Sequence, residues 1–315
     1  MTYFSLFCKT KQDKMSYFAK STMNEFVNLA RNGKNSLGYY VASFVLIMLA
    51  WTLGSLPGGW ALANRDTDDY FIPTYWVTGL MLASFGVGLL ALWLVVKHIH
   101  QRSPFTLISG NAVRWGRILA SAGWWLGLTI LVELATYFIM PNYYRLSFKP
   151  ADWWPALAIG LVLIPIQTSF EELFIRGYLM QAVGSWHLWI GVFASTLFFG
   201  FLHGANDEVA AVGLGLAMIY YMGVGLFFAL LTVFDKTLEL PLGVHAANNI
   251  YAFLLVGYPS SSLPSATIWE TTTLNFPLMM AQWVVVVVLY TLSARQFLGF
   301  GKMPYLLPTN LSKNS

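Results

Sequence analysis

Two adjacent carboxylates and a guanidinium interrupt a segment that otherwise has the composition of a membrane-spanning helix. Glu171, Glu172 and Arg176 lie within an apolar stretch that runs from about residue 153 to residue 183. Each charged side chain at membrane depth costs roughly 2.5–3.5 kcal/mol on insertion scales, so three within six residues need a compensating purpose. A function for these three side chains is therefore the default hypothesis.

Helical spacing separates the roles of the three side chains. Glu172 and Arg176 are four residues apart and can pair on one face of a helix. Glu171 points about 100° away from Glu172, because successive residues of an α-helix are rotated by that angle. The spacing leaves Glu171 available for another task.

Two more apolar segments contain polar side chains at regular spacing. Phe199 and His203 are four residues apart at the end of one segment, so the ring can pack beside the imidazole. His245 and Asn249 share a helix face in another segment, whereas Asn248 points elsewhere. The spacing therefore favours Asn249 over Asn248 as the partner of His245.

A helical hairpin would bring two of these groups to one depth. The residues 184–187 are expected to form the turn, with Glu171 before it and His203 after it. At 1.5 Å per residue the two side chains lie roughly 21 and 25 Å from the turn. We expect the carboxylate and the imidazole to face each other across an antiparallel helix pair.

Each pattern alone also has a structural explanation. A lone intramembrane histidine is more often a packing residue than a catalyst, and a Glu–Arg pair four residues apart is usually structural. Glu133, isolated in a third apolar segment, is interpreted as a helix-packing residue. A functional interpretation depends on the occurrence of three motifs, in order, each on an apolar helix.

The composition indicates an integral membrane protein. Of the 315 residues, 57% are hydrophobic and 10% are charged, whereas soluble domains have roughly 25% charged residues. The single cysteine, Cys8, excludes an intrachain disulfide and a cysteine-based metal cluster. The net charge of +4 gives no indication of nucleic-acid binding.

The apolar segments predict an all-α, polytopic bundle of about eight transmembrane helices, since about 20 helical residues cross a bilayer. The fifth and seventh segments are short and give the weakest predictions. The segments lie near residues 38–56, 75–97, 117–140, 153–183, 188–204, 209–234, 241–257 and 276–294.

The distribution of basic residues predicts that both termini are cytoplasmic. All but three of the 18 lysines and arginines then fall on the cytoplasmic side, the exceptions being Arg65, Arg145 and Lys149. The external connectors near Asp66 and Asp207 are acidic instead.

The chain divides into four parts. Residues 1–36 form a polar tail, 37–150 contain the first three transmembrane helices, 151–258 contain all three motifs in helices four to seven, and 259–315 add a loop, the last span and a short tail. One difficulty concerns depth, because His203 precedes an external connector whereas His245 follows a cytoplasmic one. Convergence requires a site near mid-depth, or a sixth segment that tilts or breaks at its glycines between Gly213 and Gly225.

The ordered trio of motifs resembles the CAAX protease and bacteriocin-processing (CPBP or Abi) family of intramembrane proteases. The family pattern is Glu-Glu-x-x-x-Arg, then Phe-x-x-x-His, then His-x-x-x-Asn or Asp. All three occur here without departure at a motif position, and the likeness covers about residues 155–255. The resemblance implies an intramembrane endopeptidase with its site open to the cytoplasmic side.

The resemblance also implies a role for each motif residue. Glu171 would act as the general base on water, which His203 would help to hold. His245 and Asn249 would stabilise the oxyanion. The supporting residues would be Glu172 and Arg176, which hold the fourth helix, and Phe199, which packs against the site.

The metal dependence stays open at this point. Glu171, His203 and His245 could be zinc ligands with water in the fourth position, leaving Glu172 as the base. No His-Glu-x-x-His motif occurs, and the family has been interpreted both ways. The residues favour metal-free glutamate catalysis slightly, with Zn²⁺ as the alternative cofactor.

The expected partners are the lipid bilayer and a peptide or protein substrate in or near it, with no nucleic acid. The compact chain favours a bacterial inner membrane. Two other functions stay open. One is a proton-coupled transporter that uses Glu171, Glu172, His203 and His245 as a relay. The other is a non-catalytic scaffold or bacteriocin-immunity protein.

Overall fold

Every apolar segment predicted from the sequence forms a helix in the computed structural model, which describes residues 24–64, 66–67 and 70–300. The prediction of an all-α, polytopic helix bundle is confirmed. The eight main helices are α3 (Leu37–Asn64), α4 (Thr74–Leu94), α5 (Trp115–Ile139), α6 (Pro150–Glu172), α8 (Leu188–Leu202), α10 (Leu214–Asp235), α11 (Glu239–Leu254) and α12 (Phe276–Phe297).

Six helical segments of the described chain are long and apolar enough to cross a membrane. They are α3, α4 with its π-helical extension Val95–Ile99, α5, α6 with its continuation to Gly184, α10 and α12. The helices α8 and α11 have 15 and 16 residues and so measure only about 22–24 Å, against a hydrocarbon core of about 30 Å. These are the two segments that gave the weakest predictions.

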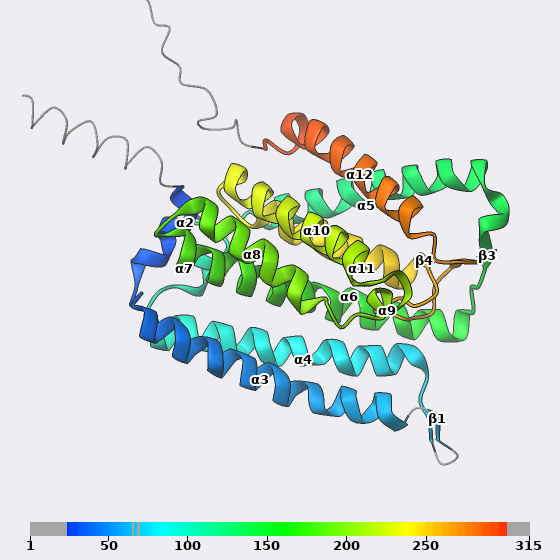
Figure 1. Ribbon diagram of the computed structural model, residues 1–315, viewed down its shortest axis with the longest axis horizontal. Helices are drawn as coiled ribbons and strands as arrows, with labels where there is room; N and C mark the ends of the chain where they lie inside the picture. The colour runs from blue at the N-terminus through cyan, green and yellow to red at the C-terminus, as the bar shows by residue number, and fades with distance from the viewer. Residues whose placement is uncertain (1–23, 65, 68–69, 301–315) are drawn as a thin grey trace, which may run out of the picture.

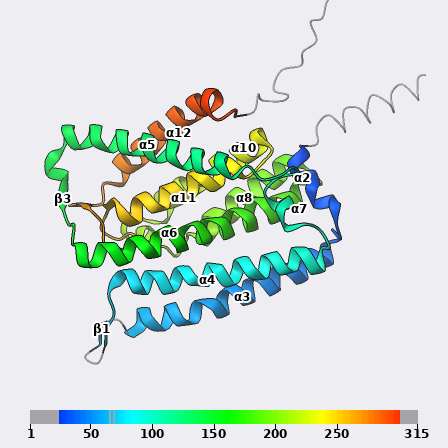
Figure 2. The same ribbon diagram turned by 180° about the vertical axis from the view of Figure 1, so that it is seen from behind.

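The two short helices lie between the outer helix pairs of the bundle. In Figures 1 and 2, α3 and α4 form one side, α5 and α12 form the opposite side, and α6, α8, α10 and α11 lie between them. The helix α11 packs against α5, α6 and α10, and α8 packs against α10 and the continuation of α6. The helix α11 is thus covered by its neighbours, whereas α8 keeps one face exposed, with Ile190, Phe193 and Phe201 on it.

The connectors gather at the two ends of the bundle as the predicted topology requires. One end contains α2 (Glu25–Asn28) and the 3₁₀ turns Leu29–Asn32 and Pro104–Leu107, together with α7 (Gln181–Gly184). Hydrogen bonds from Arg102 to the Leu29 carbonyl and to Gln181 join three of these connectors. We call this the closed end.

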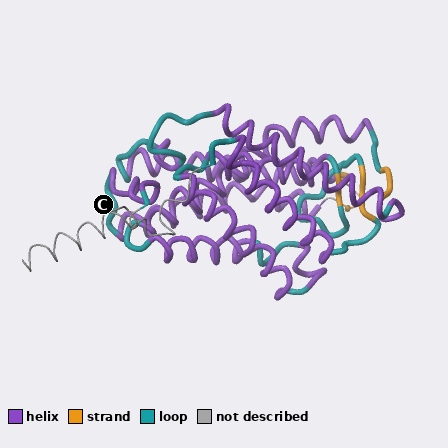
Figure 3. Tube along the Cα trace, turned by 90° about the horizontal axis from the view of Figure 1, so that it is seen from above, coloured by secondary structure: helices purple, strands orange, loops and turns teal. Residues whose placement is uncertain are grey.

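The opposite end contains all the strands of the described chain, and we call it the open end (Figure 3). Here β1 (Asp66–Thr67) pairs antiparallel with β2 (Tyr70–Phe71). A second small sheet forms from β3 (Tyr144–Leu146), β5 (Trp269–Thr271) and β4 (Val256–Gly257), with β5 antiparallel to β3 and parallel to β4. The segment 258–275, predicted to be a loop, therefore contains one strand.

The helix α6 continues without interruption into a π-helical stretch, Leu173–Met180. Pro150 lies in its first turn, where the missing backbone donor is not needed. At Gly177 a Cβ would lie 2.7 Å from the Leu107 carbonyl oxygen, so glycine permits a close approach of the connector. π-helical stretches occur frequently at functional sites, and this one begins directly after Glu172.

The sixth predicted segment is broken rather than continuous. A short helix, α9 (Asp207–Val212), ends at Gly213, and α10 begins at the next residue. Gly213 has φ +86°, a conformation that side chains other than glycine rarely adopt. A broken sixth segment is one of the arrangements that were predicted to let His203 and His245 converge.

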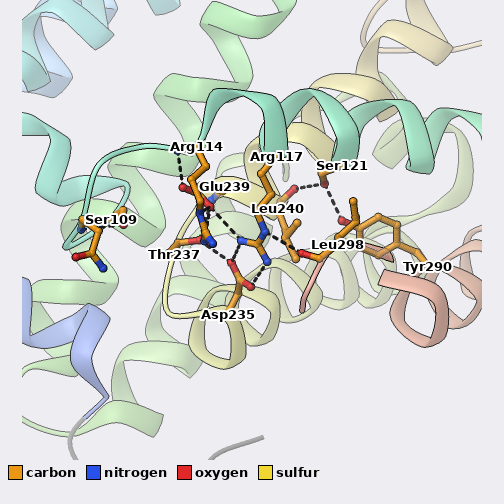
Figure 4. A network of polar contacts seen from close by, with 11 residues as sticks. Ser109, Arg114, Arg117, Ser121, Asp235, Thr237, Glu239, Leu240, Tyr290 and Leu298 are labelled. Atoms are coloured by element: carbon orange, nitrogen blue, oxygen red, sulfur yellow. Dashed lines mark hydrogen bonds and ion pairs between the residues drawn. The ribbon is translucent and has the colours of Figure 1, made fainter. Parts of the chain in front are cut away.

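Four helices are joined near the closed end by a network of ion pairs and hydrogen bonds (Figure 4). Arg117 of α5 makes two hydrogen bonds to Asp235 at 2.5 and 2.6 Å and a third to Glu239 at 3.0 Å. Ser121 of α5 donates to the Leu240 carbonyl and contacts the Tyr290 hydroxyl of α12 at 2.7 Å. The network fixes the start of α11 and therefore the depth of His245.

Candidate active site

Glu171, in the last turn of α6, has one carboxylate oxygen with a hydrogen bond and one without. Its Oε1 accepts a hydrogen bond of 2.8 Å from Gln167 Nε2. Its Oε2 makes no hydrogen bond in the described chain, although the side chain is buried. Buried carboxylate oxygens are normally hydrogen-bonded, so an unpaired one marks a place for a further group.

Glu172 and Arg176 form the ion pair that their spacing predicts. Arg176 Nη1 donates to Glu172 Oε1 at 2.7 Å, and neither side chain is exposed. Arg176 Nη2 donates to the Gly225 carbonyl at 3.2 Å, and the guanidinium lies 4.4 Å from the centre of the Phe199 ring. The pair thus links α6 to α8 and α10.

His245 lies between the two carboxylates. Its Nδ1 is 2.9 Å from Glu172 Oε1, and its Nε2 is 3.4 Å from Glu171 Oε2. The Phe228 ring lies 5.0 Å from the imidazole and limits its other face. Glu172 therefore orients His245, a contact that helical spacing could not predict across 73 residues of sequence.

Gln167 connects Glu171 to the asparagines of α11. Asn249 Nδ2 donates to Gln167 Oε1 at 3.2 Å, while Gln167 Nε2 donates to Glu171. Asn248 Nδ2 donates to Asn249 Oδ1 at 3.3 Å, and Asn248 lines the same cavity as Asn249. The prediction that Asn248 points elsewhere is therefore wrong, because the cavity extends along more than one face of α11.

His203 is the C-terminal cap of α8. Its Nδ1 is 2.8 Å from the Phe199 carbonyl oxygen, and its ring stacks on Tyr221 at 4.7 Å. Within the described chain, the imidazole that makes an ion contact with Glu171 is that of His245 and not that of His203. Glu171 and His203 nevertheless line one cavity, and Glu171 is near enough to act electrostatically on the His203 imidazole, so their opposition across the helix pair stays a prediction.

That cavity has a volume of about 470 Å³. The four side chains predicted to act on the substrate all line it: Glu171, His203, His245 and Asn249. The ring of Phe199 lies 4.3 Å from the His203 ring and 6.0 Å from the His245 ring, so it spaces the two imidazoles. The short α8 and the break at Gly213 allow the two histidines to converge at one depth.

A second group of polar residues surrounds His203. Tyr221, which stacks on this imidazole, donates a hydrogen bond of 3.2 Å to Glu208 and accepts one of 2.9 Å from Asn206. Glu208 also accepts from the Tyr258 hydroxyl and the Ser262 amide, each at 2.9 Å. Glu208 follows Asp207 in a connector predicted to be external, and the structure buries its side chain and gives it four donors.

Glu133 lies away from this cavity, in agreement with its interpretation as a packing residue. It accepts hydrogen bonds from the Tyr144 hydroxyl and from Gln282 Nε2, which links α5 to β3 and α12. It is not among the residues that line the cavity.

The arrangement of these side chains does not fit a metal site. In the part of the chain that the structure describes, no three His, Cys, Asp or Glu side chains form a group that could hold a metal ion. Both nitrogens of His245 face carboxylates, and His203 Nδ1 faces a backbone carbonyl. We therefore derive no chemical step through a metal.

Comparisons with known proteins agree with the three motifs. A family model described as "Type II CAAX prenyl endopeptidase Rce1-like" matches residues 150–251. A Bacillus subtilis protein called "Uncharacterized protein YyaK" is 30% identical over 284 residues, covering 84% of this chain and 93% of the relative. The chain belongs to the CPBP family.

The CPBP match has two consequences. It places the chain in the general class of CAAX-type membrane proteases. The matched residues, 150–251, include every residue of the three motifs. The long alignment with the Bacillus subtilis relative extends well beyond these motifs, although the name of that relative assigns it no function. No solved structure gives a significant match.

Proposed function

We propose that the protein is an intramembrane endopeptidase in which Glu171 activates a water molecule. Glu171 Oε2 has no hydrogen-bond partner and belongs to a residue that lines the cavity, so a water bound there would meet an available base. In the proposed reaction this carboxylate takes a proton as the water oxygen attacks the peptide carbonyl carbon. A general base of this kind typically contributes 10²–10⁴-fold to the rate.

His245 and Asn249 are the proposed donors to the oxyanion of the tetrahedral intermediate. Asn249 Nδ2 uses one hydrogen on Gln167, which leaves its second hydrogen for the substrate oxygen. His245 is oriented by Glu172 through Nδ1, and it donates to the oxyanion through Nε2 when both ring nitrogens carry a proton. When the intermediate collapses, the protonated Glu171 gives its proton to the leaving amine.

The remaining motif residues are proposed to hold this arrangement in place. Glu172 bonds both Arg176 and His245, so it fixes the ring that the reaction uses. Phe199 contacts the rings of both histidines and lies under the Arg176 guanidinium. His203 is proposed to help hold the reacting water through Nε2, because its Nδ1 is occupied by a backbone carbonyl.

One observation carries this proposal: a carboxylate, two imidazoles and a carboxamide from three separate helices line a single cavity. The substrate is proposed to be a peptide or protein segment in or near the bilayer. The proposed location is the bacterial inner (cell) membrane, and the Bacillus relative supports a bacterial one.

Variants of Glu171 and His203 test the proposal. We expect Glu171→Gln to lower peptide cleavage by about 10²–10⁴-fold and His203→Ala to lower it as well, both with an unchanged melting temperature in detergent. Glu133→Gln is the matched control, because it also removes a carboxylate from a membrane helix but lies away from the cavity. Cleavage by Glu171→Gln at the wild-type rate would refute the assignment.

Metal dependence is tested separately. The proposed mechanism predicts that purified wild-type protein keeps its cleavage rate after chelation and dialysis. Elemental analysis of the same sample measures bound zinc. Stoichiometric zinc together with loss of cleavage on chelation would replace the metal-free mechanism.

A proton-coupled transporter has less support from the structure. The cavity is lined at one end of the bundle by connector residues, but by none of the connectors at the closed end. Uptake into vesicles that depends on a proton gradient, together with no peptide cleavage, would favour the transporter over the enzyme.

A further inference from the structure

The cavity reaches the surface at the open end. Its lining includes four residues with exposed side chains at that end: Leu62 and Thr74, on either side of the β1–β2 hairpin, Ala205, between α8 and α9, and Asp207, the first residue of α9. The segment 258–264 contributes Tyr258, Ser262 and Pro264 to the same part of the lining. The mouth of the cavity is therefore formed by the connectors of the open end.

Toward the closed end the cavity is sealed by packed side chains. On the side of Glu171 toward the closed end lies the buried Glu172–Arg176 ion pair. The stacked rings of Phe170, Phe174 and Tyr178 run down the same helix, with successive centres 5.4 and 6.2 Å apart. No residue of the connectors 24–36, 98–114 or 181–187 lines the cavity. A substrate arriving from the closed end would meet a filled core.

Charge identifies which end is cytoplasmic. Basic residues next to membrane spans are retained on the cytoplasmic side. At the open end the described connectors contain Arg145 and Lys149 as their basic residues. The closed end contains Arg31, Lys34, Lys97, Arg102, Arg114, Arg117, Lys236 and Arg295. The closed end is accordingly assigned to the cytoplasm.

We infer that the active-site cavity is entered from the non-cytoplasmic side and that its substrate is a polypeptide segment exposed on that face of the membrane. That the entering molecule is a substrate rests on the proposed protease function. The direction of entry does not. It differs from the cytoplasmic opening that the family resemblance implies. The difference arises from the distribution of basic residues between the two ends of the bundle and from the residues that line its cavity.

The lining also restricts the chemistry of the substrate. Its carboxylates and imidazoles are those of Glu171, Asp207, Glu208 and the two histidines, and it includes no lysine or arginine. A free terminal carboxylate or an acidic side chain would find no cation there, because Arg176 is paired with Glu172 behind the cavity wall. Apolar residues of α3 and α4, including Trp51, Leu82 and Phe85, line another part of the cavity. The structure therefore favours an internal peptide bond in an apolar segment without acidic residues.

Labelling of single cysteines from one side of the membrane tests the direction of entry. Starting from the full chain with Cys8→Ser, the probes are Ala205→Cys at the mouth and Ala252→Cys within the cavity. Ala151→Cys, exposed at the open end, and Ser103→Cys, exposed at the closed end, are the controls for sidedness. Each is a small change, and melting of the purified variants checks that they fold.

In intact cells, a membrane-impermeant maleimide should label Ala205→Cys, Ala252→Cys and Ala151→Cys, whereas Ser103→Cys should be labelled only after permeabilisation. Labelling of both cavity positions only after permeabilisation would overturn the inference. Labelling of Ala151→Cys only after permeabilisation would overturn it too, because the bundle would then have the opposite orientation. Failure of Ala252→Cys to react in intact cells while Ala205→Cys reacts would also contradict it, since the mouth would not lead to the site.

The chemistry of the substrate is tested with the unmodified protein in proteoliposomes. Two internally quenched peptides differ only in a lysine or an aspartate beside the same apolar core. We expect kcat/KM to be at least about tenfold higher for the lysine peptide, because the aspartate lies among like charges. Equal values, or a preference for aspartate, would refute the charge argument. Labelling does not require cleavage, so failure of the inferred direction and failure of the protease function give different results.

Discussion

At the scale of single residues, Glu172 has the same relation to His245 as an orienting carboxylate has to a catalytic imidazole. One of its oxygens bonds both Arg176 and the Nδ1 atom of His245. This contact determines which ring nitrogen of His245 faces Glu171 and the cavity. The Glu-Glu pair thus combines a residue proposed to react with a residue proposed to position another.

Glu172→Gln should destabilise the protein strongly. The change leaves Arg176 in a fully buried position without an anionic partner, and breaking a buried pair typically costs about 3–5 kcal/mol. Thermal melting in detergent measures the effect. The double variant Glu172→Gln/Arg176→Gln should melt closer to wild type than the single variant does. A single variant as stable as wild type would show that the pair contributes nothing.

Gln167 is expected to act as a positioning residue for both sides of the site. Gln167→Leu removes the bonds to Glu171 and Asn249 together, and Asn249→Leu removes one of those bonds and a proposed oxyanion donor. Each single variant should lower kcat by about tenfold or more, and the double variant should lose less than the product of the two losses. Steady-state kinetics on all four proteins completes the cycle. Strictly multiplicative losses would mean that Gln167 acts independently of Asn249.

At the scale of the elements, the site depends on where α8 and α11 begin and end. The break at Gly213 precedes α10, which carries Tyr221 against the ring of His203. At Gly243 of α11 a Cβ would lie 2.3 Å from the Ile118 carbonyl oxygen, so α5 and α11 are in backbone contact there. Together with the network around Arg117, this contact places His245 deep enough to reach Glu171.

Arg117→Leu should loosen this part of the bundle. The change removes the hydrogen bonds to Asp235 and leaves Glu239 with Arg114 as its basic partner, while both carboxylates stay buried. We expect a loss of about 3 kcal/mol in the free energy of unfolding, measured by denaturation in detergent. Arg145→Leu is the control, because its pair with Glu270 is exposed and should contribute less than about 1 kcal/mol. Equal effects of the two variants would contradict the argument.

The connector at the closed end should make stability depend on pH. Burial lowers the pKa of His100 below its usual 6.5 against the opposing effect of the Lys34 carbonyl, and the nearby Arg102 lowers the pKa further. A histidine with a lowered pKa stabilises the fold fully above pH 6.5, and this stability is lost as the pH falls through 6.5 toward the lowered value. Each unit of the shift corresponds to about 1.4 kcal/mol.

His100→Gln should abolish this part of the pH dependence. The melting temperature of the wild type should fall between pH 7.5 and pH 5.5, and the fall should be smaller in the variant. A wild-type melting temperature that does not fall over this range would contradict the role of His100.

The sequence was sufficient for the helices and for the local pairs, but not for contacts between distant segments. Apolar length predicted the main helices, and spacing predicted the Glu172–Arg176 pair. The contact of Glu172 with His245 depends on the packing of α6 against α11, which local spacing does not encode. Gln167 was missed although it lies four residues before Glu171, because a glutamine in a membrane helix is a weaker signal than a charge.

At the scale of the whole molecule, the bundle is organised as two ends joined by helices of unequal length. Exposed tryptophans occur near both ends, where their rings suit the interface between lipid and water. Trp76 and Trp154 lie at the open end, and Trp115 and Trp186 lie at the closed end. The long outer helices account for the thickness of the bilayer, while α11 is shielded by neighbouring helices and α8 keeps one apolar face exposed.

Reporter fusions can test whether the two short helices cross the membrane. The connectors after α8 and after α11 meet at the open end, where Glu208 bonds Tyr258 and Ser262. Alkaline phosphatase inserted after Asn206 or Ser260 should therefore be active, because that enzyme folds only outside the cytoplasm. Insertion after Asn111, at the closed end, should be inactive, and insertion after Asn142, at the open end, should be active. Activity after Asn142 without activity after Asn206 and Ser260 would mean that α8 and α11 do not cross, since the long helices alone would then determine the topology.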